Sequence, residues 1–123
     1  MNKFDLERRL INFSVLILEI VKGIPNSKAG HQLANQLVRS GTSVSLNYGE
    51  AMSAESRKDF IHKMKIILKE LRETNICLEL ILLGKVSKSV ISIQNAKEEC
   101  NELISIFVKS IETAQKNLNG GKK

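Results

Sequence analysis

The chain has 123 residues and a mass of 13.8 kDa, the usual size of a single domain. Its 19 Lys and Arg against 13 Asp and Glu give a formal net charge of +6 and a pI near 9.5, and 42% of its residues are hydrophobic. This composition excludes a disordered chain, and the 4% aromatic content with one Pro argues against an all-β sandwich or barrel.

The first predicted helix covers about residues 5–22. Its apolar residues recur at alternating spacings of three and four, which places them on one face of a helix: Leu6, Leu10, Phe13, Ile17, Ile20 and Ile24. Gly23 and Pro25 predict its end, because Gly suits a helix C-cap and Pro does not fit a helix interior.

The second predicted helix begins at a cap formed by Asn26 or Ser27 and continues to about Met52, before a brief turn over 53–56. Its apolar face is formed by Leu33, Leu37, Val44, Tyr48 and Ala51.

A third helix opens with a shortened capping box, from Ser56 to Asp59, and ends at Gly84. Its expected core positions have heptad-like spacing: Ile61, Met64, Leu68, Leu71, Asn75, Leu78 and Leu82. Ser87 or Ser89 caps a fourth helix, whose expected core face is Ile93, Cys100, Phe107, Ile111, Ala114 and Leu118. Residues 1–119 are thus expected to form one domain, and residues 120–123 a flexible tail.

Long helices joined by short links pack antiparallel with their neighbours, so the pattern predicts an all-α, up-down-up-down four-helix bundle. Several apolar side chains fall outside the narrow core stripes: Leu16, Leu18, Val21, Ile76, Leu83 and Ile91. This surplus favours self-association over the alternative, a wide core stripe in a small bundle.

A polar row follows the second helix at spacings of four and three, with Arg39 at its edge: Gln36, Ser40, Ser43, Asn47 and Glu50. Long charged residues normally dominate an exposed face, whereas Ser and Asn dominate here. The row therefore favours a hydrogen-bonded seam, inside the bundle or between subunits, over a solvated face. Glu70 or Glu73 is the expected partner of Arg39, and Asp59 and Lys63 form an expected i,i+4 pair.

The third helix also carries a cationic row, formed by Lys58, Lys65, Lys69 and Arg72. His62 lies beside this row. Six cations against Asp59 and Glu70 give residues 57–72 a local net charge of 6 − 2 = +4. Such a row can neutralise phosphates, although solubilising lysines are the commoner explanation for one helix alone. No sequence signature supports base-specific recognition.

The sequence offers little for catalysis. The histidines are His31 and His62, and one Asp-x-x-His spacing is too little for a di-iron bundle, so no metal, cofactor or enzymatic activity is expected. Cys77 and Cys100 are expected to be buried, reduced thiols that could lie close to each other. Two cysteines are too few for a disulfide scaffold and fit a reducing compartment. No signal peptide or membrane-spanning run is recognised, so the expected location is the cytoplasm.

The segment from Gln36 to Ser43, followed by Asn47, Glu50, Asp59, Lys63 and the run from Glu70 to Thr74, resembles a bacterial four-helix bundle family. That family is named after open reading frames in intervening sequences of 23S ribosomal RNA genes. Where its members commonly carry an aromatic-Trp-Leu run after Glu-Thr, this chain has Ile76-Cys77-Leu78, so the smaller Cys77 leaves volume to be filled.

The resemblance implies antiparallel bundles that associate into homopentameric rings. A similar ring is the basic accessory protein of diversity-generating retroelements, which engages a reverse transcriptase and nucleic acid. The family's polar residues map onto Arg39, Ser43, Asn47, Glu50, Lys63 and Glu70, where a structural network is implied.

Two functional hypotheses follow. In the first, the chain is a non-enzymatic, self-associating bundle whose basic row contacts RNA, DNA or a nucleic-acid enzyme. In the second, it is a structural or protein-interaction module in which the charge serves solubility.

Overall fold

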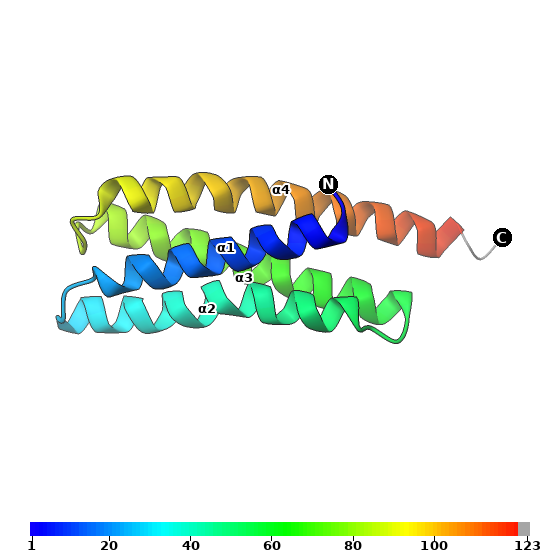
Figure 1. The fold of residues 1–123 in the computed structure, drawn as a ribbon, viewed down its shortest axis with the longest axis horizontal. Helices are drawn as coiled ribbons and strands as arrows, with labels where there is room; N and C mark the ends of the chain where they lie inside the picture. The colour runs from blue at the N-terminus through cyan, green and yellow to red at the C-terminus, as the bar shows by residue number, and fades with distance from the viewer. Residues whose placement is uncertain (121–123) are drawn as a thin grey trace.

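A computed structural model describes residues 1–120 of the chain and shows four helices: α1 (Lys3–Lys22), α2 (Lys28–Met52), α3 (Arg57–Leu83) and α4 (Val90–Gly120). Consecutive helices run in opposite directions along a common long axis (Figure 1). The predicted all-α, up-down-up-down bundle is therefore confirmed. Of the tail predicted over 120–123, Gly120 ends α4 instead, and 121–123 lie outside the described residues.

Side-chain caps fix where three of the helices begin. Ser27 accepts a hydrogen bond from the backbone N–H of Gly30, and Ser56 from that of Asp59. The α1 helix starts two residues before the predicted position because Asn2 and Asp5 form a capping box there. Gly23 ends α1 as predicted, and Ser89 directly precedes α4.

The buried core runs along the bundle and is formed by all four helices. Its largest fully buried side chains are Phe13, Phe107, Leu10, Ile17, Leu37, Ile67, Leu71, Leu78, Ile81, Ile93, Leu103 and Val44. On α3, the predicted core positions Leu68 and Leu82 are partly buried and pack against the core, whereas Asn75 is partly buried and donates to Asn101 at 3.2 Å. Ile67, Thr74 and Ile81, one residue earlier in each case, are buried instead. The buried face of α3 turns this way because α3 contacts α2 on one side and α4 on the other.

Each helix packs against two neighbours, in the order α1–α2–α3–α4 and back to α1. Within residues 1–120, no Cα atoms of the diagonal pairs α1/α3 and α2/α4 come within 8 Å of each other. The outward faces of α1 and α3 therefore lie on opposite sides of the molecule.

Candidate functional site: a polar seam and a cationic row

Arg39 links α2 to α3 near the middle of the bundle. Its guanidinium donates to the carboxylate of Glu70 at 3.0 Å and to that of Glu73 at 2.8 Å. Glu70 is buried, and burial followed by the neighbouring Glu73 raises its pKa. The hydrogen bond from Arg39 lowers the pKa of the more exposed Glu73. One cation thus holds two carboxylates in a single cluster.

The same α2–α3 seam contains two further polar contacts. The hydroxyl of Thr74 donates to that of Ser40 at 2.9 Å, and both side chains are buried. The ammonium of Lys63 donates to Glu50 at 3.1 Å. The expected pair between Asp59 and Lys63 is therefore wrong, because Lys63 extends across the seam to α2.

Ser43 and Asn47 lie half-buried on α2 and interact with each other. The Asn47 amide donates to the Ser43 carbonyl at 2.9 Å and to the Ser43 hydroxyl at 2.8 Å. Gln36 is exposed and accepts from Arg39 at 3.4 Å. Within residues 1–120 no buried side-chain nitrogen or oxygen lacks a hydrogen-bond partner. The polar row thus joins helices through Arg39, Ser40 and Glu50, while Ser43 and Asn47 bond within α2.

The cationic row lies on the outward face of α3, opposite the core. Lys58, Lys65, Lys69 and Arg72 are all exposed. Within residues 1–120 none of these four cations forms a salt bridge, in contrast to Lys63 and Arg39. At about 1.5 Å per residue, the row from Lys58 to Arg72 is about 21 Å long.

The first half of the row borders a groove between α3 and the end of α4. The groove has a volume of about 250 Å³ and is lined by Lys58, Ile61, His62, Lys65, Gln115 and Leu118. No carboxylate contributes to its lining, so the charged side chains that line it are the two lysines.

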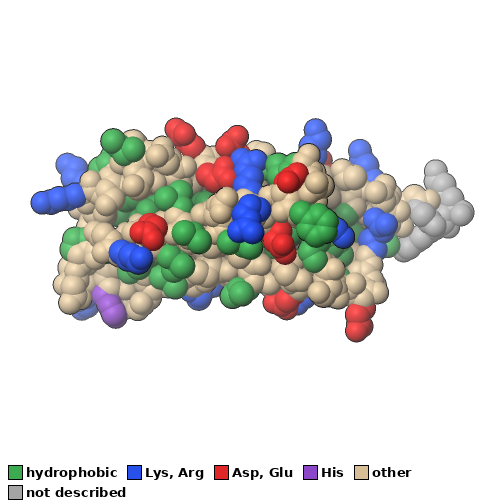
Figure 2. All heavy atoms as spheres, viewed as in Figure 1, with side chains coloured by type: hydrophobic (Ala, Val, Ile, Leu, Met, Phe, Trp, Pro, Cys, Tyr) green, Lys and Arg blue, Asp and Glu red, His purple; other side chains and the backbone are tan. Residues whose placement is uncertain are grey.

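The outward face of α3 changes character after Arg72. The stripe that carries the cations continues at helical spacing as Ile76, Leu80 and Leu83, which are 63%, 54% and 72% exposed. A second outward apolar stripe on α1 consists of Phe4, Ile11, Val15 and Leu18. Figure 2 shows hydrophobic side chains among charged ones on the side of the molecule where α1 and α2 face the viewer. Of the predicted surplus apolar residues, Leu18, Ile76, Leu83 and Ile91 are exposed, and Leu16 and Val21 pack against the core.

Both cysteine thiols are free and buried. The Cys77 thiol lies 3.5 Å from the carbonyl of Leu33 on α2, whereas the Cys100 thiol lies 3.2 Å from that of Leu71 on α3. Cys77 also lines a hollow of about 230 Å³ between α2 and α3. Burial raises the pKa of both thiols, that of Cys100 to about 12, so both are protonated at neutral pH.

The sequence patterns did not reveal the polar contacts at the other three helix pairs. Between α1 and α2, Ser14 donates to the carbonyl of Gly41 at 2.7 Å and hydrogen-bonds Ser45. Arg9 forms a bidentate pair with Glu99 of α4, with both distances at 2.7 Å. Lys97 of α4 pairs with Glu79 of α3 at 2.6 Å. The spacing of polar residues along α1 does not predict the serine contact, because Ser14 lies among apolar residues.

The described part of the chain offers no metal centre or membrane span. Among residues 1–120 there is no group of three His, Cys, Asp or Glu side chains placed to hold a metal ion. The same residues contain no helix that is both long and apolar enough to cross a membrane.

The family model of the 23S rRNA-intervening sequence protein matches residues 2–109. The chain belongs to this family. Among solved structures, it is similar to a protein of unknown function from the S23 ribosomal protein family of Bacteroides thetaiotaomicron VPI-5482. The two share 29% sequence identity and a TM-score of 0.82, over 91% of this chain and 99% of the other. No match was found among curated proteins.

Proposed function

We propose that this family member is a non-enzymatic, self-associating bundle that binds the phosphate backbone of nucleic acid through the outward face of α3. The observation that carries the proposal is the cationic row itself: four exposed side chains about 21 Å end to end, none held in a salt bridge within residues 1–120. Cations that are already paired inside a protein contribute little to phosphate binding, whereas free ones release the counterions of the nucleic acid.

Backbone contact without base recognition fits the chemistry of this face. Lys and Arg contact phosphate oxygens irrespective of sequence, and the groove beside Lys58 and Lys65 is lined by no Phe or Tyr ring for base stacking, its aromatic side chain being the imidazole of His62. We therefore expect binding that varies little with nucleotide sequence and falls steeply with salt.

Self-association is supported by the two apolar stripes on α1 and α3. Because these helices are diagonal in the bundle, their stripes point in different directions. A contact between two different surfaces generates a ring when its rotation closes. In a ring, the cationic row of each subunit would add to a larger field. The pentamer implied by the sequence resemblance is one such assembly.

A fluorescence titration of the purified chain with labelled RNA and DNA at about 50 mM and about 200 mM salt tests the proposal. Four phosphate contacts predict a slope of log K against log salt of about −3.6 on duplex DNA. Lys65→Ala with Lys69→Ala is expected to weaken binding and reduce the slope by about 2, without changing the melting temperature.

The matched control is Lys28→Ala with Lys88→Ala, which removes two exposed lysines at the other end of the bundle. Equal losses in both double variants, or no binding at either salt concentration, would contradict nucleic-acid binding by the row. The second hypothesis, a protein-interaction module, would then rest on the apolar stripes. It predicts a protein partner that is still recovered after nuclease treatment.

A further inference from the structure

A cavity of about 520 Å³ opens at the end of the bundle where α1 and α3 begin. The α4 helix has 31 residues and α1 has 20, so the last turns of α4 extend beyond α1 (Figure 1). The side of α4 that lines this cavity carries Ile106, Ser110, Thr113, Ala114 and Asn117. This volume lies within the range of about 300–1,000 Å³ that is typical of small-molecule sites.

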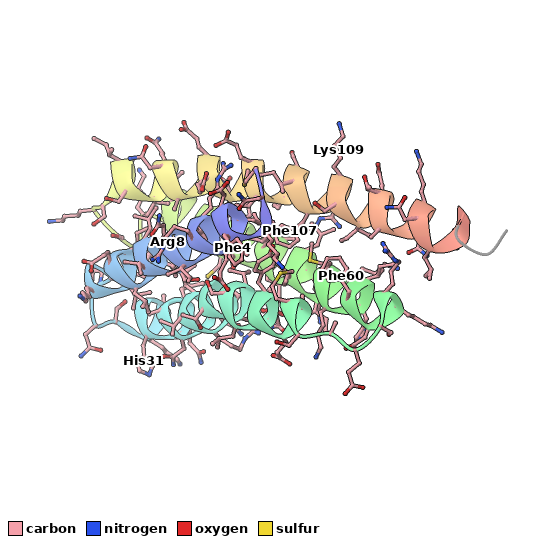
Figure 3. The ribbon with its side chains drawn as sticks, turned by 45° about the vertical axis from the view of Figure 1, so that its right-hand side comes forward. Phe4, Arg8, His31, Phe60, Phe107 and Lys109 are labelled. Carbon is pink, nitrogen blue, oxygen red and sulfur yellow. The ribbon has the colours of Figure 1, made fainter. Side chains whose placement is uncertain are left out.

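The floor of the cavity is apolar. Leu6, Tyr48, Met64 and Ala114 line it and are at most 8% exposed. Behind the floor, the rings of Tyr48 and Phe107 pack edge to face, with their centroids 6.1 Å apart. In Figure 3, Phe60 of α3 lies beneath the C-terminal part of α4, and Lys109 extends from α4 away from the bundle. The buried polar group of the floor is the hydroxyl of Tyr48, which donates to the backbone carbonyl of Lys3 at 3.4 Å.

The rim of the cavity is cationic. Lys3, Arg57 and Lys109 line it, together with the hydroxyls of Ser110 and Thr113, and none of the 15 lining residues is acidic. These three cations form no salt bridge within residues 1–120. Lys3 instead lies 5.4 Å from the ring centroid of Phe4. Glu7 lines a neighbouring hollow together with Lys3, and Glu55 lines another together with Lys3 and Arg57.

We propose that this cavity binds a medium-chain alkyl carboxylate, with the alkyl chain on the apolar floor and the carboxylate beside Arg57 at the rim. Charge complementarity selects an anionic head group, and the floor selects a flexible hydrocarbon body. The proposal uses none of the four residues of the cationic row and is independent of nucleic-acid binding.

Tyr48 supplies the signal for the test, because it is the single tyrosine of a chain without tryptophan. The purified full-length chain is titrated with decanoate below its micellar concentration while tyrosine emission is recorded. A saturable change is expected with decanoate. With decyltrimethylammonium, which has a similar chain and the opposite charge, the change is expected to be much weaker.

Arg57→Gln is expected to weaken decanoate binding by about fivefold, the effect of one exposed charge pair. Lys116→Gln is the matched control, since Lys116 is exposed on α4 and does not line the cavity. Ala114→Leu adds bulk to the apolar floor and should weaken the emission change, with a thermal melt to verify folding. Equal responses to the two amphiphiles, a linear decanoate response, or equal effects of the Gln variants would overturn the proposal.

Discussion

Glu70 and Glu73 have pKa values shifted in opposite directions although they share the guanidinium of Arg39. The difference comes from position, since Glu70 lies inside the seam and Glu73 at its edge. For Glu70, desolvation raises the pKa more than Arg39 lowers it. For Glu73, the hydrogen bond from Arg39 is the larger effect and lowers the pKa. Arg39 therefore stabilises the fold mainly by keeping two neighbouring carboxylates together.

Replacing Arg39 tests this balance. Arg39→Ala is expected to lower the free energy of unfolding by about 1 kcal/mol at pH 7, because a buried carboxylate and its neighbour lose their shared cation. The lowered pKa of Glu73 means that its stabilisation is present at neutral pH and is lost as pH falls through that pKa. Urea unfolding at pH 7 and pH 3 should show a smaller effect at pH 3.

The control for Arg39→Ala is the same substitution in a Glu70→Gln, Glu73→Gln background. With both carboxylates neutral, the loss of Arg39 should cost little. An undiminished cost there would assign the effect to packing of the arginine side chain rather than to its charge.

Cys100 predicts a second dependence on pH. Burial raises its pKa from the ordinary 9.0 to about 12, so between these values the unfolded chain releases a proton that the folded chain retains. The free energy of unfolding should therefore fall as pH rises from 9. Cys100→Ala removes this pH dependence. Measured by urea unfolding from pH 8 to 11, the stability difference between wild type and variant should move in favour of the variant as pH rises. A constant difference would contradict the raised pKa.

At the scale of the helices, every neighbouring pair in the bundle is joined by at least one polar contact. Arg9–Glu99 joins α1 to α4, Ser14–Ser45 joins α1 to α2, and Lys97–Glu79 joins α3 to α4. Hydrogen bonds and ion pairs form only at one alignment of the two helices, so they favour a single helix–helix register. An apolar core alone would allow one helix to shift along the other.

The contact between α1 and α2 also depends on a glycine. A Cβ atom on buried Gly41 would lie 2.7 Å from Cγ2 of Ile17, on the facing helix. Gly41→Ala is therefore expected to destabilise the chain by about 1–3 kcal/mol, because the helices must separate. Gly49→Ala is the matched control on the same helix, where the added Cβ meets nothing within 4 Å. It should stabilise by up to about 1 kcal/mol through helix propensity. Thermal melts of both variants decide the matter, and destabilisation of equal size would contradict the packing argument.

At the scale of the whole molecule, the two outward apolar stripes are the surfaces through which we expect the chain to self-associate. Ile76 and Leu80 are more than half exposed in the single chain, and their burial against another copy would contribute about 25 cal/mol of association free energy per Å² of apolar surface. Ile76→Lys with Leu80→Lys is expected to shift the light-scattering mass of the purified chain towards the monomer. The matched substitution Leu46→Lys changes a 69% exposed residue of α2 outside both stripes and should leave the mass unchanged. A monomeric wild-type chain would refute self-association through these stripes.

The spacing of apolar residues and the Ser and Gly residues at helix ends determined the four helices, their order and their antiparallel packing. These features are local, and a periodic apolar face has one way to be buried in a short-looped bundle. The cationic row could also be read from spacing, because residues seven, eleven and fourteen apart share one helix face.

Only the tertiary structure decided which polar groups meet. Lys63 pairs with Glu50 rather than Asp59, and Asn47 bonds within α2 while Ser40 bonds across to Thr74. It also buried Ile67 fully and Leu68 only partly, and it assembled the cationic rim of the cavity from three helices. The physical reason is that spacing along one helix fixes a face, whereas the partner of that face depends on the rotation and height of its neighbours.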